Sequence, residues 1–388
     1  MVLKRTYMDW NATAPLSEPA RLAMLDALRL PGNASSVHSE GRAARAAVEK
    51  ARRHVAALVG AEPAHVFFTS GATEAANHVL TPDYRMGRSR LTVSHLYVSA
   101  IEHPSVREGG RFNKEQVSEI PVGRSGIVDL AALETALAAH DRAAGLPMVA
   151  VMLVNNETGI VQPVAEAARL VHQAGGLMVV DAVQAAGRIG VDIAELDADF
   201  VILSSHKVGG PKGVGALVLR GEALMPAPLI RGGGQEKGHR SGTENFHAVV
   251  GFGAASEAAL GQLAERNADI SALREELERG MRNVAPDLVI HGQDVARVSN
   301  TCFFTLPGLK SETGQIAFDL EGIALSAGSA CSSGKVGQSH VLTAMGFDPD
   351  LGALRISLGL TTTMDDVNAT LAAFAKISGR RRSAGEAA

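Results

Sequence analysis

Cysteine is rare in this chain: only Cys302 and Cys331 occur, far apart in the sequence. Two distant cysteines exclude a disulfide framework and a zinc knuckle, and they suit a reducing compartment. The start, residues 1–6, lacks the apolar core of a signal peptide. The most apolar stretches, such as 145–156, are too short to span a bilayer. We therefore expect a cytoplasmic protein with no membrane partner.

An excess of positive charge is also missing, because the formal net charge is −4. That balance gives no indication of a nucleic-acid partner. Aromatic residues make up only 4% of the chain, whereas 46% of its 388 residues are hydrophobic and 41 are glycine. This length supports a large buried core in one to three domains. The many glycines indicate the tight turns of an α/β enzyme.

The first two-thirds of the chain alternate apolar runs with amphipathic segments. Strands are predicted at 65–69, 91–99, 148–154, 177–181 and 200–203, and a helix at 164–173 ends at Gly175. This rhythm predicts right-handed crossovers and a mainly parallel sheet. Beyond residue 258 the pattern changes to a long charged helix and connector over 256–294, strands at 299–306 and 353–358, and helices at 313–321 and 364–377.

The stretch Ser204-Ser205-His206-Lys207 is the strongest indication of chemistry. It ends an apolar strand and is followed by a glycine-rich segment, 208–213. A lysine in such a place can form a Schiff base with an aldehyde cofactor, although most lysines are solvated surface groups. Polar residues also follow the other predicted strands, where ligands of open parallel sheets bind.

Three of these strand ends carry groups that suit a cofactor. Ser70-Gly71-Ala72-Thr73-Glu74 opens a helix near Ala72, whose free amides and Thr73 hydroxyl could cradle a phosphate, or could form an ordinary helix cap. Asp181 ends an apolar strand and needs a cation, such as a protonated pyridine, or a structural partner. Gln184 could donate to a hydroxyl of the same ring. His103 could stack on a flat ring, although a structural histidine is the simpler interpretation.

Two further residues point to substrate chemistry. Arg355 is a charge within an apolar strand, which suits either a substrate carboxylate or a buried salt bridge. Cys331 lies in a small, glycine-rich stretch, 326–337, that predicts a mobile loop and so favours a nucleophile over an inert buried thiol. Cys302 reads as an ordinary strand residue.

Together these motifs resemble those of the cysteine desulfurases, pyridoxal-phosphate enzymes of the aminotransferase class V family. The matching stretches cover most of the chain: 7–15, 33–38, 68–74, 154–159, 232–236, 240–245 and 355–359. The resemblance implies an α/β fold of the aspartate-aminotransferase type, with a large sheet domain of about seven strands. It implies a large domain at 16–258, a small α+β domain of 1–15 and 259–378, and a flexible tail at 379–388.

The resemblance also implies a role for each motif residue. Lys207 would be the Schiff-base lysine, His103 would stack on the ring, Asp181 would pair with the pyridinium and Gln184 would contact the ring hydroxyl. Ala72, Thr73, Ser204 and His206 would hold the phosphate, with Thr243 reaching in from a second subunit of a homodimer. Asn156 and Arg355 would bind the carboxylate of L-cysteine. Cys331 would attack the substrate sulfur, as in the long-loop group of the family.

The product implied is L-alanine, with a persulfide on Cys331 that passes to an acceptor protein or an iron–sulfur scaffold. Through that persulfide Cys331 could transiently ligate iron. The chain departs from the family in three places: the stretch 81–94, Leu360, where many relatives have arginine, and the end of the chain, which is unlike the usual endings. Two alternatives stay open: a selenocysteine lyase, and a cofactor-free scaffold, against which Lys207, Asp181, His103 and Arg355 together argue.

Overall fold

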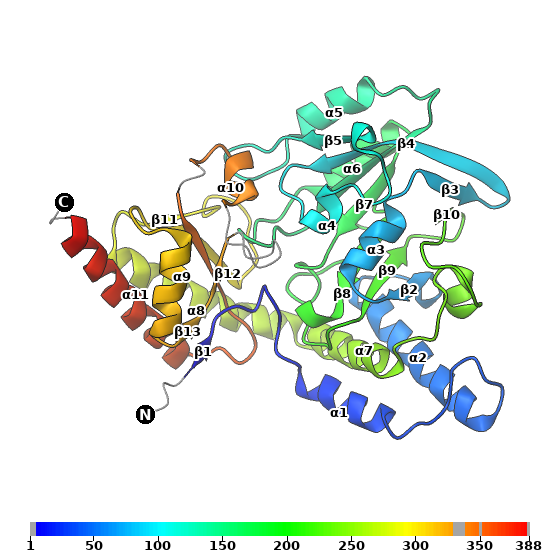
Figure 1. The fold of residues 1–388 in the computed structure, drawn as a ribbon, viewed down its shortest axis with the longest axis horizontal. Helices are drawn as coiled ribbons and strands as arrows, with labels where there is room; N and C mark the ends of the chain where they lie inside the picture. Colours follow the sequence, from blue (N-terminus) through cyan, green and yellow to red (C-terminus); the bar gives the residue numbers. More distant parts are fainter. Residues whose placement is uncertain (1–4, 329–337, 349–350, 386–388) are drawn as a thin grey trace.

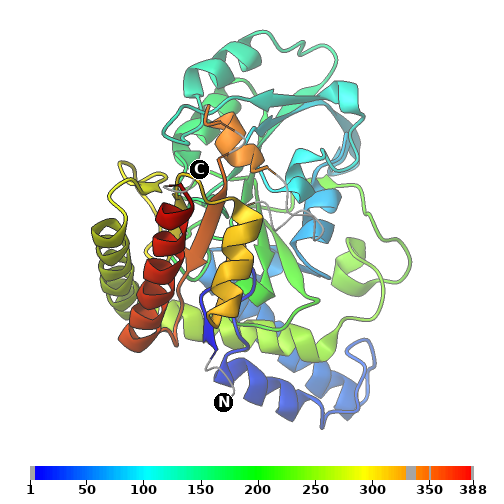
Figure 2. The ribbon, with the colours of Figure 1, turned by 60° about the vertical axis from the view of Figure 1, so that its left-hand side comes forward.

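The fold is described from a computed structural model, in which residues 5–328, 338–348 and 351–385 are described. A large region is built around a long mixed sheet, and a smaller region beside it has its own sheet and helices (Figure 1). The described chain begins and ends in the smaller region, which Figure 2 shows from a second direction. None of the helices in these three ranges is both long and apolar enough to cross a bilayer.

The large sheet has nine strands in the order β10-β3-β4-β6-β7-β8-β9-β2, with β5 paired to β4. Strands β5, β4, β6, β7 and β8 are mutually parallel, and the other pairs are antiparallel. The strand bounds are β2 Val66–Thr69, β3 Asp83–Met86, β4 Ser89–Ser99, β5 Val117–Ile120, β6 Leu146–Met152, β7 Leu177–Asp181, β8 Phe200–Ser204, β9 Gly215–Leu219 and β10 Leu224–Pro226. The expected α/β class is confirmed, with a sheet that is parallel at its centre and antiparallel at its sides.

Both faces of this sheet are buried, as its apolar strands require. Val149 and Val151 of β6 face the core shared with α2 (Ser39–Leu58), α5 (Leu130–Ala138), α6 (Val164–Gln173) and α7 (Phe246–Gly261). Met148 and Ala150, one residue out of phase, face the core shared with α3 (Ala72–Val79) and α4 (Pro104–Arg107). Helix α1 (Glu18–Ala27) packs on α7.

The smaller region has a separate apolar core. Its main sheet has the order β11-β12-β15-β14, and β1 pairs with β13. The bounds are β1 Thr6–Tyr7, β11 Val289–Ile290, β12 Thr301–Thr305, β13 Ile323–Ala324, β14 Ser326–Ala327, β15 Ala353–Ser357, α8 Leu263–Val284, α9 Ser311–Leu320, α10 His340–Ala344 and α11 Met364–Gly385. Phe304, Phe318 and Phe374 are fully buried at its centre. The domain boundaries predicted from the sequence stay a prediction.

The structure differs from the sequence expectations in two helical segments. The single long helix expected from residue 256 is two helices, because Gln262 leaves helical geometry (φ −108°, ψ 4°) between α7 and α8. The tail expected from residue 379 instead continues α11 to Gly385. Arg380 contacts Glu321 at 3.1 Å and Arg381 contacts Asp287 at 2.7 Å. These ion pairs fasten the extra turns to the smaller region.

Candidate active site

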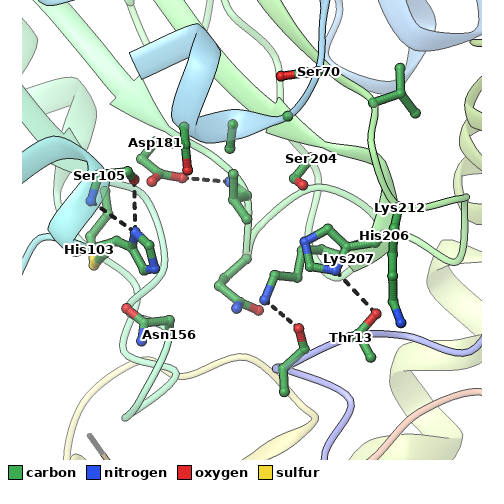
Figure 3. Close-up of a pocket in the computed structure, with 18 of the residues that line it drawn as sticks. Thr13, Ser70, His103, Ser105, Asn156, Asp181, Ser204, His206, Lys207 and Lys212 are labelled. Atoms are coloured by element: carbon green, nitrogen blue, oxygen red, sulfur yellow. Dashed lines mark hydrogen bonds between the residues drawn. The ribbon is translucent and has the colours of Figure 1, made fainter. Parts of the chain in front are cut away.

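A pocket of about 480 Å³ opens at the carboxyl ends of the central strands. It collects most of the residues predicted from the sequence to bind a cofactor: Ala72, Thr73, His103, Asn156, Asp181, Gln184, Ser204, His206 and Lys207. Figure 3 shows His103 and Asn156 on one side of it and Thr13, His206 and Lys212 on the other. Residues from the ends of five strands, β2, β4, β6, β7 and β8, therefore meet in one cavity, because the carboxyl ends of parallel strands lie on the same side of the sheet.

Lys207 sits in a single 3-10 turn, Ser205–Lys207, that directly follows β8. Its Nζ donates to the backbone oxygens of Asn11 at 2.6 Å and Ala12 at 2.8 Å. The glycines after it are required by geometry: Gly209 has φ +87°, and a Cβ on Gly210 would lie 2.1 Å from Ser205 Oγ. The amine is thus held inside the pocket by the N-terminal segment, whose part in the site the sequence patterns alone did not reveal.

Asp181 ends β7 beside Lys207 and is only 7% exposed. Its Oδ1 accepts from Val183 N at 2.9 Å. Burial raises the pKa of this carboxyl, although the Val183 amide and the charges of His103 and Lys207 act in the opposite direction. An added cation in the pocket would hold Asp181 ionised.

Gln184 lines the same wall, but its amide is arranged differently from the expectation. Nε2 donates to Asn11 O at 3.0 Å, and among the described residues Oε1, which is buried, has no hydrogen-bond partner. The group left for a ligand is therefore an acceptor, whereas the sequence interpretation had Gln184 donate. A ring hydroxyl that donates its proton would satisfy it.

Glu102 is a buried carboxyl next to His103 that does not itself line the pocket and that the sequence analysis gave no role. It is fully buried after β4, and its Oε1 accepts from Ser99 Oγ and from Met152 N, each at 2.7 Å. Burial raises the pKa of Glu102 to about 8, so the group is largely neutral at pH 7. Its position directly before His103 was the only sign in the sequence.

His103 caps α4, and its Nδ1 accepts from Ser105 N at 3.2 Å. The neutral ring consequently carries its proton on Nε2, an assignment that follows from this bond. Burial lowers the pKa of His103; Asp181 opposes the shift and Lys207 adds to it. The imidazole is therefore uncharged at neutral pH, and this hydrogen bond sets its orientation.

The opposite end of the pocket suits an anion. Helix α3 begins after Gly71 without a side-chain cap, so that its first amides are open to the cavity. The Ser204 and Thr73 side chains line the same end, with Lys212. His206 Nδ1 lies 3.1 Å from Thr13 Oγ1. Burial, helped by the charges of Lys207 and Lys212, lowers the pKa of His206 to about 4. Thr13 and Lys212 were quoted in the sequence motifs without a role.

Arg355 lies just behind this pocket, at the centre of β15. Its Nη1 donates to Asn156 O at 2.8 Å and its Nη2 pairs with Asp9 Oδ1 at 2.9 Å. The buried salt bridge left open by the sequence is thus present, and it sits one residue layer from the pocket wall. Asp9 could have been found only through its place in the motif at 7–15.

Besides Arg355, one predicted residue of the described chain, Thr243, does not line the pocket. Thr243 is exposed, in a segment fastened by Arg240 to Glu74 Oε1 at 2.9 Å. Cys331 lies outside the described residues. Cys302 is buried in β12, where burial raises the pKa of its thiol and keeps it unreactive.

Comparison with known proteins gives a consistent result. The family model described as "Aminotransferase class-V" matches residues 6–370. The chain is 37% identical over 390 residues to an "IscS-like cysteine desulfurase" of Mycobacterium tuberculosis, covering 98% of each chain. It is 39% identical over 379 residues to a "Cysteine desulfurase" of Cereibacter sphaeroides, covering 95% of this chain and 94% of that one.

Solved structures agree with the sequence relatives. The NifS-like protein from Rickettsia africae superposes with a TM-score of 0.84 at 32% identity, over 97% of this chain and 99% of that one. The likeness therefore extends over both regions of the fold.

Proposed function

The chain belongs to the aminotransferase class-V family and is a pyridoxal-phosphate-dependent cysteine desulfurase, and on that premise we propose roles for its individual residues. We propose that it takes sulfur from L-cysteine, releases L-alanine and carries the sulfur as a persulfide on Cys331. The observation that carries these roles is the meeting of Lys207, Asp181 and the open start of α3 in one cavity.

The described residues fit pyridoxal phosphate on their own chemistry. The buried carboxyl of Asp181 could pair with a protonated ring nitrogen of the cofactor. The buried Oε1 of Gln184 lacks a hydrogen-bond donor among the described residues. At the far end, the amides of α3, Ser204 and Lys212 suit a phosphate. A neutral His103 offers its ring face between the two ends.

Bound pyridoxal phosphate would supply an electron sink for the Cα–H bond of the substrate. Lys207 Nζ would hold the aldehyde carbon in the resting enzyme and then remove the proton from Cα. Asp181 would keep a proton on the ring nitrogen by remaining ionised. Asn156 and Arg355 would orient the substrate carboxylate, with Arg355 acting from behind the wall that Asn156 forms.

The sulfur step would belong to Cys331. Its thiolate would attack the sulfur of cysteine, forming an S–S bond while the Cβ–S bond breaks. The electron pair of that bond would stay with the three-carbon fragment, which takes up protons and leaves as L-alanine. One cysteine and one thiol thus give one alanine and one persulfide, with no outside oxidant.

The ends of the undescribed segment support this role for Cys331. Ser339 Oγ donates to Glu157 Oε2 at 2.5 Å, and a Cβ on Gly328 would lie 3.1 Å from the same oxygen. Glu157 directly follows Asn156 of the pocket wall.

We further propose that the active unit is a homodimer. Thr243 is exposed and does not line the pocket of its own chain, so it is available to the phosphate end of a second copy. The persulfide would pass to an acceptor or iron–sulfur scaffold protein. Because Cys331 must be a free thiol, we place the protein in the reducing cytoplasm. The selenocysteine-lyase alternative is not favoured, since the named relatives are cysteine desulfurases.

The decisive experiment compares the two cysteines. Purified Cys331→Ser should keep the visible absorbance of the bound cofactor but form no persulfide, and its alanine release from L-cysteine should fall at least about a hundredfold. Cys302→Ser is the matched control, and it should turn over at nearly the wild-type rate. Mass analysis of the two peptides after reaction with labelled cysteine locates the sulfur. Wild-type alanine release by Cys331→Ser would refute the assigned nucleophile.

A further inference from the structure

A second, much smaller cavity lies between the two regions of the fold, on the other side of Lys207 from the large pocket. It has a volume of about 20 Å³ and is lined by Trp10, Arg188, Lys207, Arg266, Asn300 and Leu358, among others. The notable feature of this cavity is that two arginines line it and no acidic residue does.

Arg188 is the more deeply buried of the two, with 8% of its surface exposed. Within the described chain its guanidinium makes one hydrogen bond, from Nη1 to Gln184 O at 2.8 Å. Burial, followed by the repulsion of Arg266, lowers the pKa of Arg188 to about 9. The group is still a cation at neutral pH, and no carboxylate of the described residues pairs with it.

Arg266 approaches from α8 on the opposite side of the cavity. Its Nε is buried and makes no hydrogen bond with any described residue. Burial lowers the pKa of Arg266 to about 10, so this guanidinium is also charged. Two like charges, one on the buried Arg188 and one on the half-buried Arg266, therefore line one small cavity, which is costly unless something of opposite charge lies between them.

The other buried arginines show what this chain normally does with such a charge. Arg52 pairs with Glu236 at 2.7 Å, Arg297 with Glu278 at 3.0 Å, and Arg355 with Asp9 at 2.9 Å. Among the residues the structure describes, neither Arg188 nor Arg266 has a carboxylate partner. Arg111 also lacks a carboxylate partner among these residues, but its guanidinium donates to three backbone oxygens, whereas Arg188 makes a single side-chain hydrogen bond.

We propose that the cavity binds one small monovalent anion of halide size between the guanidiniums of Arg188 and Arg266. The volume is that of about one water-sized occupant, which favours a halide over phosphate, sulfate or an organic carboxylate. Each guanidinium offers several N–H donors to such an ion. The proposal does not rest on the proposed function, because neither arginine is assigned to the cofactor or the substrate.

The test measures thermal unfolding of the holoenzyme in potassium chloride and in potassium gluconate at equal ionic strength. Gluconate is too large for the cavity, so only chloride should raise the unfolding midpoint. At a chloride concentration a hundredfold above its Kd, the ratio of folded to unfolded protein rises about a hundredfold. Arg188→Gln and Arg266→Gln should each reduce the chloride-induced rise in the ratio of folded to unfolded protein at least about tenfold.

Arg297→Gln is the matched control: it removes a buried arginine that has its own carboxylate partner. It should lower stability but keep the full difference between chloride and gluconate. Equal midpoints in the two salts for the wild-type protein would overturn the proposal, and so would an undiminished chloride effect in both cavity variants.

A second measurement needs only the wild-type protein, in case a variant does not fold. Crystals grown in sodium bromide should show an anomalous peak within hydrogen-bond distance of both guanidiniums. Ordinary water density there, with no anomalous signal at a saturating bromide concentration, would show that the cavity is merely hydrated and would overturn the anion site.

Discussion

The central strands of the large sheet end at two edges, one formed by their amino ends and one by their carboxyl ends. Similar polar residues lie at both edges, but their hydrogen bonding differs. At the amino ends of β7 and β8, the ring of His172 lies between two carboxylates, with Nδ1 2.8 Å from Asp197 and Nε2 3.0 Å from Asp199. Asp199 also accepts from Met178 N at 2.7 Å. Each of these charged groups meets an opposite charge or a donor supplied by the chain itself.

The carboxyl ends of the same strands leave polar atoms unsatisfied. Within the described protein, Gln184 Oε1, three residues beyond β7, is buried without a hydrogen-bond partner, and Asp181 at the end of β7 is buried with a raised pKa. Glu102 Oε2, beyond the carboxyl end of the nearby strand β4, is also buried without a partner among the described residues. Such atoms are costly in a folded protein unless a ligand completes them. The comparison shows that polar residues at strand ends do not mark the site by themselves; their incomplete satisfaction does.

Among the predictions that test this comparison, Asp181→Asn should have the largest effect, a loss of turnover. The amide cannot hold a cationic ring nitrogen, so desulfurase turnover should fall roughly a hundred- to a thousandfold. The cofactor should still bind, because the phosphate end of the pocket is unchanged. Turnover and cofactor content are measured on the same preparation.

The matched control for Asp181→Asn is Asp199→Asn at the opposite edge. It removes a carboxylate that binds Met178 N and His172, so the free energy of unfolding should fall by about 1–3 kcal/mol. Turnover of the folded enzyme should stay within about twofold of wild type. Equal losses of turnover in both variants would mean that the two edges do not differ as described.

Glu102→Gln tests the comparison through the pH dependence of the free energy of unfolding. Because folding raises the pKa of Glu102 from 4.5 to about 8, its contribution to stability is fully present below about pH 4.5 and is lost as the pH rises through about 8. Glutamine has no proton to lose, so the variant should gain on wild type by about 1.4 kcal/mol for each pH unit in this window. Urea unfolding at several pH values measures the difference, and a constant difference would contradict the raised pKa.

Much of the fold and the pocket could be predicted from the sequence because the causes are local. The apolar run before Lys207 and the helical spacing of Val164, Ala167, Ala168 and Val171 specify β8 and α6 directly. Parallel pairing then brings the strand ends together, and the resemblance supplied the residue roles. His103, Asp181 and His206 consequently lie in one pocket, as expected.

The rest depends on contacts between residues far apart in the chain. Whether Arg355 meets a substrate or Asp9 depends on a pairing across 346 positions. The carbonyls that hold Lys207 come from Asn11 and Ala12, and Glu102 accepts a hydrogen bond from Met152, 50 positions away. No pattern in a local window contains such information, and these contacts decide which side-chain atoms stay free for a ligand.

The smallest expected effect comes from His172→Gln, and its sign distinguishes the two edges. Burial alone would lower the pKa of His172, but hydrogen bonds to Asp199 and Asp197 outweigh it and raise the pKa, whereas the pKa values of His103 and His206 in the pocket are lowered. The stabilisation by His172 is therefore fully present below about pH 6.5 and is lost as the pH rises through its folded pKa. After screening by solvent, the variant should lose less than about 1 kcal/mol at pH 6 and almost nothing at about pH 9. Chemical unfolding at the two pH values provides the measurement. A loss of stability that grew with pH would show that the imidazole is neutral between the two carboxylates. The proposed contrast between the two edges would then be wrong for His172, Asp197 and Asp199.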